Sequence, residues 1–107
     1  MDEGQTRCRG SGARSVTVDA VAELIQQYST HVRTPEGLVY LVRTYGAARA
    51  DGIWIGWLEF EPLDRRAPAL RTAQETHQAN RAALESWASG LEVAYFEGAF
   101  SRAEIVP

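Results

Sequence analysis

The chain contains a single cysteine and no lysine. With one thiol, Cys8, no disulfide can form within the chain. There is no CxxC pair, and neither His31 nor His77 has a second ligand at a recognised metal-binding spacing. All eleven basic residues are arginine, which we attribute to coding bias rather than to phosphate recognition. We therefore expect neither a metal site nor another cofactor.

Long apolar runs and an excess of positive charge are also missing. No apolar run approaches the length of a membrane span, and the N-terminus lacks the apolar core of a secretory signal. The formal net charge is -3, whereas nucleic-acid-binding domains usually carry a basic excess that neutralises phosphates. These absences predict a cytoplasmic protein and argue against membrane and nucleic-acid partners.

The length and composition suit one small domain. Apolar residues make up 45% of the 107 residues, as in an ordinary globular protein. Residues 1–15 are rich in Gly, Ser and Arg and offer almost nothing to bury. We expect a disordered leader over residues 1–15 and a single domain over residues 16–107.

The densest block of β-favouring residues lies at 51–61, and it predicts the second arm of a β-hairpin. Residues 38–45 supply the first arm, and Asp51-Gly52 supplies the turn. Alternation places Ile53, Ile55, Trp57, Glu59 and Glu61 on one side of the second arm, and Trp54, Leu58 and Phe60 on the other. Large apolar groups on both sides predict cover on both faces over part of this strand.

Apolar residues recur at steps of three and four between residues 18 and 32. They are Val18, Val21, Leu24, Ile25, Tyr28 and Val32. This spacing is typical of one face of an amphipathic helix, with Thr17 as its N-cap. We predict an N-terminal helix that covers the sheet; pairing with a second copy of the same helix is the alternative.

The C-terminal third predicts helices. Residues 70–77 fit either a short third strand or the start of a helix at a Thr72–Glu75 capping box, and we favour the strand. A helix is expected from about Asn80 to Ser89, with Gly90 as its stop. A second short helix within residues 92–105 would place Val93, Phe96, Phe100 and Ala103 on one side.

These elements together predict an α+β fold. We expect an antiparallel sheet of two to three strands, with its hairpin at about residues 38–61. An N-terminal amphipathic helix and one or two C-terminal helices would cover it, because a two-stranded hairpin alone is marginally stable in water.

One group of residues is a candidate for catalysis. Glu59 and Glu61 share a face of the second arm, and Glu75 and His77 share a face if residues 70–77 form the neighbouring strand. The four side chains would then meet as an acid/base or metal-binding cluster. The alternative is that they line the solvated end of a sheet.

Aromatic residues support a binding function better. Tyr40, Tyr45, Trp54 and Trp57 lie on the two arms of the hairpin. An aromatic strip is a usual anchor of protein interfaces, although the same residues also suit a core beneath helices. Our leading hypothesis is a non-enzymatic module that associates with itself or with a protein partner. Stacking of single-stranded bases on this strip is weaker, because a basic surround is missing.

Three segments carry a resemblance to known sequences. They are GWLEF at 56–60, ETHQANRAALESWASGLE at 75–92 and EGAFSRA at 97–103. They resemble a group of short bacterial proteins without an assigned activity, so this resemblance implies no catalytic residue or cofactor. The order of elements is also similar to that of HicB-type antitoxins, which pair with a small toxin and often carry a DNA-binding tail. That similarity implies an antitoxin-like or nucleic-acid-associated regulator as a further alternative.

Overall fold

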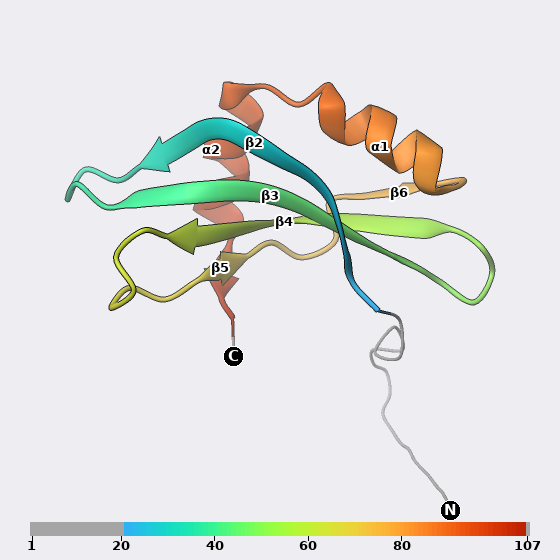
Figure 1. The fold of residues 1–107 in the computed structure, drawn as a ribbon, viewed down its shortest axis with the longest axis horizontal. Coiled ribbons are helices and arrows are strands. Elements are labelled where there is room, and N and C mark those ends of the chain that lie inside the picture. Colours follow the sequence, from blue (N-terminus) through green and yellow to red (C-terminus); the bar gives the residue numbers. More distant parts are fainter. Residues whose placement is uncertain (1–20, 107) are drawn as a thin grey trace, which may run out of the picture.

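The computed structural model describes residues 21–106, which form an antiparallel sheet and two helices (Figure 1). The strands are β2 (Glu23–Arg33), β3 (Val39–Ala48), β4 (Trp54–Pro62), β5 (Leu70–Arg71), β6 (Thr76–Gln78) and β7 (Glu104–Ile105). Helix α1 spans Arg81–Ser89 and helix α2 spans Val93–Arg102. The strand order is β2-β3-β4-β5-β7, and β6 pairs with the start of β4. The α+β class is confirmed.

The predicted hairpin is confirmed. Strands β3 and β4 pair antiparallel without interruption, from Tyr40 opposite Pro62 to Ala48 opposite Trp54. In the turn, the N–H of Arg49 donates to the carbonyl of Ile53 at 2.7 Å. Gly52 has a φ of +89°, a left-handed conformation that favours glycine and that the Asp-Gly turn predicted.

The predicted N-terminal helix is wrong over the described residues, because Glu23–Arg33 is a strand. β2 pairs antiparallel with β3, and its register shifts between Leu24 and Gln26 and again between Gln27 and His31. These irregularities break the two-residue alternation, so the apolar residues acquire a spacing that imitates a helix. Pairing with β3 outweighs the local pattern. Residues 18–20 and the predicted leader lie outside the described residues.

The sheet is also larger than the two to three strands expected. Among residues 21–106 it has six strands, and residues 70–77 contribute two short ones rather than one. The connection between β5 and β6 stays attached to β4, because Thr72 Oγ1 accepts a hydrogen bond from Leu58 N–H at 3.0 Å. The N–H of Glu75 donates to the Gly56 carbonyl at 2.8 Å.

Both C-terminal helices are confirmed. Asn80 is the N-cap of α1, and its side-chain oxygen accepts a hydrogen bond from Ala83 N–H at 2.8 Å. Gly90 follows the last residue of α1 as predicted. In α2, Phe96 is buried and Phe100 packs edge-on against Tyr40 and Phe60. No helix within residues 21–106 is long and apolar enough to cross a membrane.

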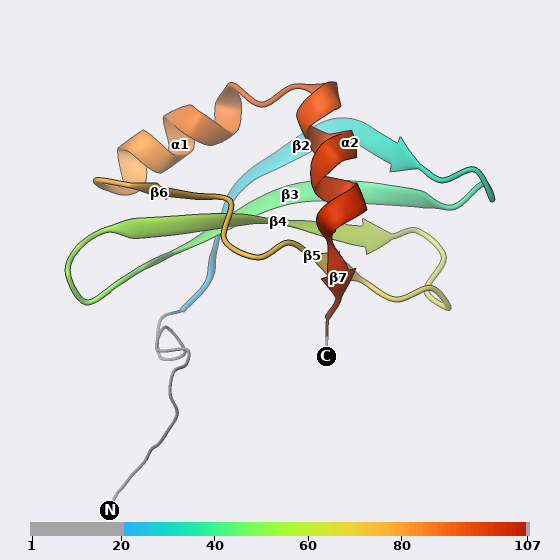
Figure 2. The ribbon, with the colours of Figure 1, turned by 180° about the vertical axis from the view of Figure 1, so that it is seen from behind.

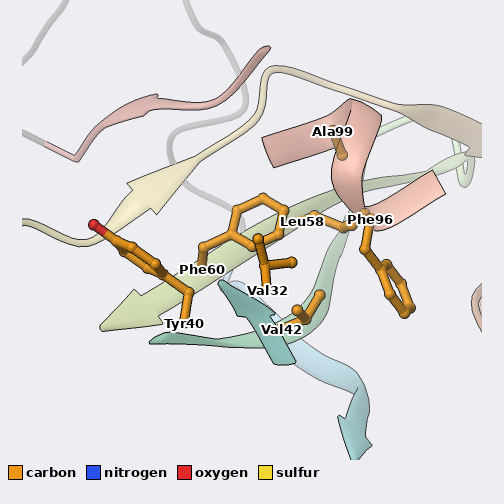
Figure 3. Close-up of a cluster of buried hydrophobic side chains, with 7 residues drawn as sticks. All are labelled: Val32, Tyr40, Val42, Leu58, Phe60, Phe96 and Ala99. Atoms are coloured by element: carbon orange, nitrogen blue, oxygen red, sulfur yellow. The ribbon is translucent and has the colours of Figure 1, made fainter. Parts of the chain in front are cut away.

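The core lies between the helices and one face of the sheet (Figure 2). Its main cluster consists of Val32, Tyr40, Val42, Leu58, Phe60, Phe96 and Ala99 (Figure 3). Leu84 of α1 is fully buried against Gly46 and Gly56, which lie opposite each other on β3 and β4. Both helices therefore pack on the same face of the sheet.

Candidate functional site

The face of the sheet turned away from the helices is the candidate site, and we call it the open face. Its central side chains alternate along β3 and β4 with the core residues. They are Leu41, Arg43 and Tyr45 of β3 and Trp57, Glu59 and Glu61 of β4. Within residues 21–106, neither helix lies on this face (Figure 1).

Aromatic side chains form one row across the open face. Tyr45 lies directly opposite Trp57, and Leu24 of β2 lies opposite Tyr45 on the other side. Both aromatic residues are partly exposed, and Leu24 is 46% exposed. We call Leu24, Tyr45 and Trp57 the aromatic row. Direct cross-strand neighbours of this kind stabilise a sheet and also present a continuous apolar surface.

Charged side chains form the next row. Arg43 lies opposite Gln27 on one side and opposite Glu59 on the other, and Glu59 lies opposite Arg71 of β5. We call these four residues the charged row. The row carries two arginines and one glutamate, and Glu61 in the neighbouring position supplies a second negative charge.

Hydrogen bonds hold the charged row in place. The guanidinium of Arg43 pairs with the carboxylate of Glu61, and its Nε donates to Gln27 Oε1 at 3.2 Å. Hydrogen bonding to Glu61 raises the pKa of Arg43 above its already high ordinary value, so this side chain remains charged. Exposed pairs of this kind typically contribute only about 0.2–1 kcal/mol each, so their main effect here is to fix orientation.

The indole of Trp57 is also satisfied within the open face. Its Nε1–H donates to Glu59 Oε2 at 3.0 Å, and the same oxygen lies 3.9 Å from Arg71 Nη1. The indole nitrogen would therefore keep a hydrogen-bond partner if another surface covered the ring. This arrangement removes one cost of burying Trp57 at an interface.

The predicted aromatic strip is divided between the two faces. Tyr45 and Trp57 lie on the open face. Tyr40 is only 4% exposed and packs in the core. Trp54 lies on the helix side, where the guanidinium of Arg81 lies 5.8 Å from its ring centroid. The structure therefore brings together two of the four residues and not all of them.

The four acid/base candidates do not meet in one place. Glu59 and Glu61 lie on the open face, and His77 lies opposite Ile55 near the start of β4. Glu75 instead lies beneath α2, where it binds α2 side chains. Within residues 21–106, no group of three or more His, Cys, Asp or Glu residues is arranged to hold a metal ion.

Glu75 belongs to a polar cluster that sequence reasoning missed. Its carboxylate accepts hydrogen bonds from the Tyr95 hydroxyl and from Arg102 Nη2, both at 2.5 Å. Burial, together with the hydrogen bond to the negative Glu75 carboxylate, raises the pKa of Tyr95 to about 12. The cluster fastens the β5–β6 connection to α2. No local pattern signals it, because Glu75 and Arg102 are 27 residues apart.

Two hollows of the surface lie at the border of the open face, because Gln27 lines one and Arg71 lines the other. One, of about 470 Å³, lies between residues 26–30 of β2 and residues 91–93 at the start of α2. The other, of about 260 Å³, lies between residues 71–73 and the C-terminal residues 102–105. None of the four acid/base candidates lines either hollow.

No protein-family model, curated protein or solved structure matches this chain. The resemblances of sequence and of element order therefore stay predictions.

Proposed function

We propose that this domain is a non-enzymatic protein-interaction module that docks through its open face. One observation carries the proposal. Tyr45 and Trp57 form a partly exposed pair on a sheet face that, among residues 21–106, neither helix covers. Aromatic residues surrounded by polar groups are the usual anchors of protein interfaces. The aromatic row supplies such an anchor, and the charged row supplies a polar border.

The polar border is suited to contact with protein. Arg43 and Glu61 already pair with each other, and Glu59 already binds Trp57 and lies near Arg71. Covering the border therefore places no unpaired charge at an interface, which would otherwise be costly. Nucleic acid would gain little from this face, because two glutamates offset the two arginines.

The competing hypothesis is a small acid/base or metal-assisted enzyme using Glu59, Glu61, Glu75 and His77. The geometry favours the interaction module over this enzyme. Glu75 is bound by Tyr95 and Arg102 on the helix side. Glu59 and Glu61 lie on the opposite face, and His77 lies beside the start of β4.

The test compares Trp57→Ala and Tyr45→Ala with Arg65→Ala, a control in an exposed loop. Each variant is measured by size-exclusion chromatography with light scattering and by cross-linked capture of partners from a cell extract. We expect the Trp57 substitution to weaken association, with itself or with a captured protein, by more than about tenfold. The Arg65 control should bind as the wild type does.

Circular dichroism separates lost binding from lost folding. If Trp57→Ala loses the folded spectrum, Trp57 is required by the fold and Tyr45→Ala becomes the deciding variant. Association that survives in folded forms of both variants would show that the open face is not the docking surface.

A further inference from the structure

We infer that the partner of the open face is a second copy of this chain, packed sheet against sheet with the two-fold axis parallel to the strands. The inference rests on the proposed docking function and names its partner. Two features of the open face support it, its balance of charge and the order of its rows, and its area sets the expected affinity.

The charge of the open face suits a copy of itself. Arg43 and Arg71 are balanced by Glu59 and Glu61 at neighbouring positions of the sheet. The chain as a whole carries a net charge of -3. Two copies of a face with no net charge do not repel each other, whereas two surfaces with the net negative charge of the chain would. A strongly acidic or basic partner would gain little electrostatic attraction from such a face.

The order of the rows fixes the direction of the two-fold axis. An axis that runs along the strands between β3 and β4 places each β3 side chain over the β4 residue of its own row in the other copy. Arg43 then meets the partner subunit's Glu59, and Tyr45 meets the partner subunit's Trp57. Both rows are near the middle of their strands, where two twisted sheets packed within about 30° of each other stay closest.

An axis that runs across the strands reverses the order of the rows instead. If it passes through the aromatic row, Arg43 and Glu59 face the neighbouring aliphatic row of the other copy, where Ala47 and Ile55 are already buried. If it passes between the two rows, the aromatic residues face the charged ones. Either arrangement desolvates charges against apolar groups, so only the axis along the strands matches every row.

The area allows a reversible dimer. β2, β3 and β4 are 11, 10 and 9 residues long. Three strands about 30 Å long and about 4.8 Å apart cover about 400 Å² of flat sheet. Stable complexes typically bury about 800 Å² of accessible surface on each partner, so this contact belongs to the weaker, transient class.

The experiment uses charge reversal and mixing. Arg43→Glu makes the centre of the face acidic, and Glu59→Arg makes it basic. Each variant alone should self-associate about tenfold more weakly than wild type, because both symmetric contacts become repulsive. An equimolar mixture should associate at least as tightly as wild type. In the mixed dimer, each acidic row meets a basic one. Sedimentation equilibrium measures affinity, and native mass spectrometry identifies the mixed dimer.

A matched control separates specific docking from general attraction between opposite charges. Arg81 and Glu85 form an ion pair one turn apart on α1, on the helix side of the sheet. Arg81→Glu and Glu85→Arg should each self-associate with the affinity of the wild type. An equimolar mixture of the two should associate no more tightly than either variant alone. Arg43→Gln and Glu59→Gln provide milder variants if either reversal disturbs folding; each should weaken association by a few fold.

The outcomes separate this inference from the proposed function. The second copy is not the partner if wild-type protein stays monomeric up to about 1 mM and the mixture of Arg43→Glu with Glu59→Arg also stays monomeric. The docking function would still stand if Trp57→Ala abolished capture of a different protein. A wild-type dimer unaffected by either reversal uses another surface and overturns the inference. The inference is also overturned if mixing Arg43→Glu with Glu59→Arg raises the affinity no more than mixing the two α1 control variants does.

Discussion

Leu84 of α1 packs directly against the glycine pair of the sheet, and this contact predicts that two damaging substitutions will compensate each other. Leu84 is fully buried. A Cβ atom placed on Gly56 would lie 2.7 Å from Leu84 Cδ1 and 3.2 Å from Thr76 Cγ2. The first distance is too short for two carbon atoms, so a side chain at position 56 must displace Leu84.

The magnitudes follow from this geometry. Gly56→Ala alone should lower the free energy of unfolding by about 1–3 kcal/mol, the usual cost of overpacking. Leu84→Ala alone should lower it by about 2–5 kcal/mol, because it leaves a cavity in the core. In the double variant the new methyl group occupies part of that cavity and the clash disappears. The double variant should therefore be at least about 1 kcal/mol more stable than the sum of the single effects predicts.

Gly46 provides an internal contrast. A Cβ atom there would overlap Leu84 Cδ2 more closely than at Gly56, and it would also lie 3.1 Å from the carbonyl oxygen of Ile55, a backbone atom that cannot move cheaply. Leu84→Ala removes the first contact and leaves the second, so Gly46→Ala with Leu84→Ala should stay less stable than Gly56→Ala with Leu84→Ala. Gly98→Ala is the control, because its Cβ would meet only Arg102 Nη1 at 3.5 Å. It should raise stability by up to about 1 kcal/mol and show no coupling to Leu84.

Urea denaturation followed by tryptophan fluorescence and circular dichroism measures all the variants. Single effects of Gly56→Ala and Leu84→Ala that add to within about 0.5 kcal/mol would refute the packing of α1 on the glycine pair.

Two further predictions concern single side chains. Asn80→Ala should lower the free energy of unfolding by about 1 kcal/mol because the hydrogen bond that caps Ala83 N–H is lost. Asn80→Asp should retain this hydrogen bond and its stabilisation. Denaturation followed by circular dichroism compares the two variants, and equal losses of stability would contradict the cap. Tyr95 should titrate at about 12, above its ordinary 10.0, so its contribution to stability is complete below pH 10 and is lost as the pH rises through about 12. Glu75→Gln should lower the pKa of Tyr95, while burial keeps this pKa above 10.0. Ultraviolet titration measures the pKa, with Tyr95→Phe as the reference that lacks this hydroxyl. An unchanged pKa would contradict the contact between Tyr95 and Glu75.

Elements with a local chemical signal are the ones that sequence reasoning located. Asn80 and Gly90 bound α1, and Asp51-Gly52 forms the hairpin turn; each acts within a few residues of its position. Strand β2 carries no such signal. Its register shifts at Gln26 and His31 are imposed by pairing with β3, so its apolar spacing indicated the wrong element.

The short strands were missed for a related reason. β5 and β7 have two residues each, and β7 pairs with β5 across more than thirty residues of chain. Two residues are too few to show any periodicity. The same holds for the cluster of Glu75, Tyr95 and Arg102, which depends on where α2 packs and not on any pattern around Glu75.

Alternation along β4 separated Trp54 from Trp57 correctly, but it did not show which face the helices would cover. Gly46 and Gly56 decide this, because their missing side chains let Leu84 lie against the backbone of β3 and β4. Tyr45 and Trp57, the next residues along, point the other way and leave no comparable space for a helix. A second sheet packs about 10 Å away and accommodates side chains of this size between the layers. The glycine pair therefore favours α1 on this face, and the other face keeps the aromatic row that suits the proposed sheet-to-sheet contact.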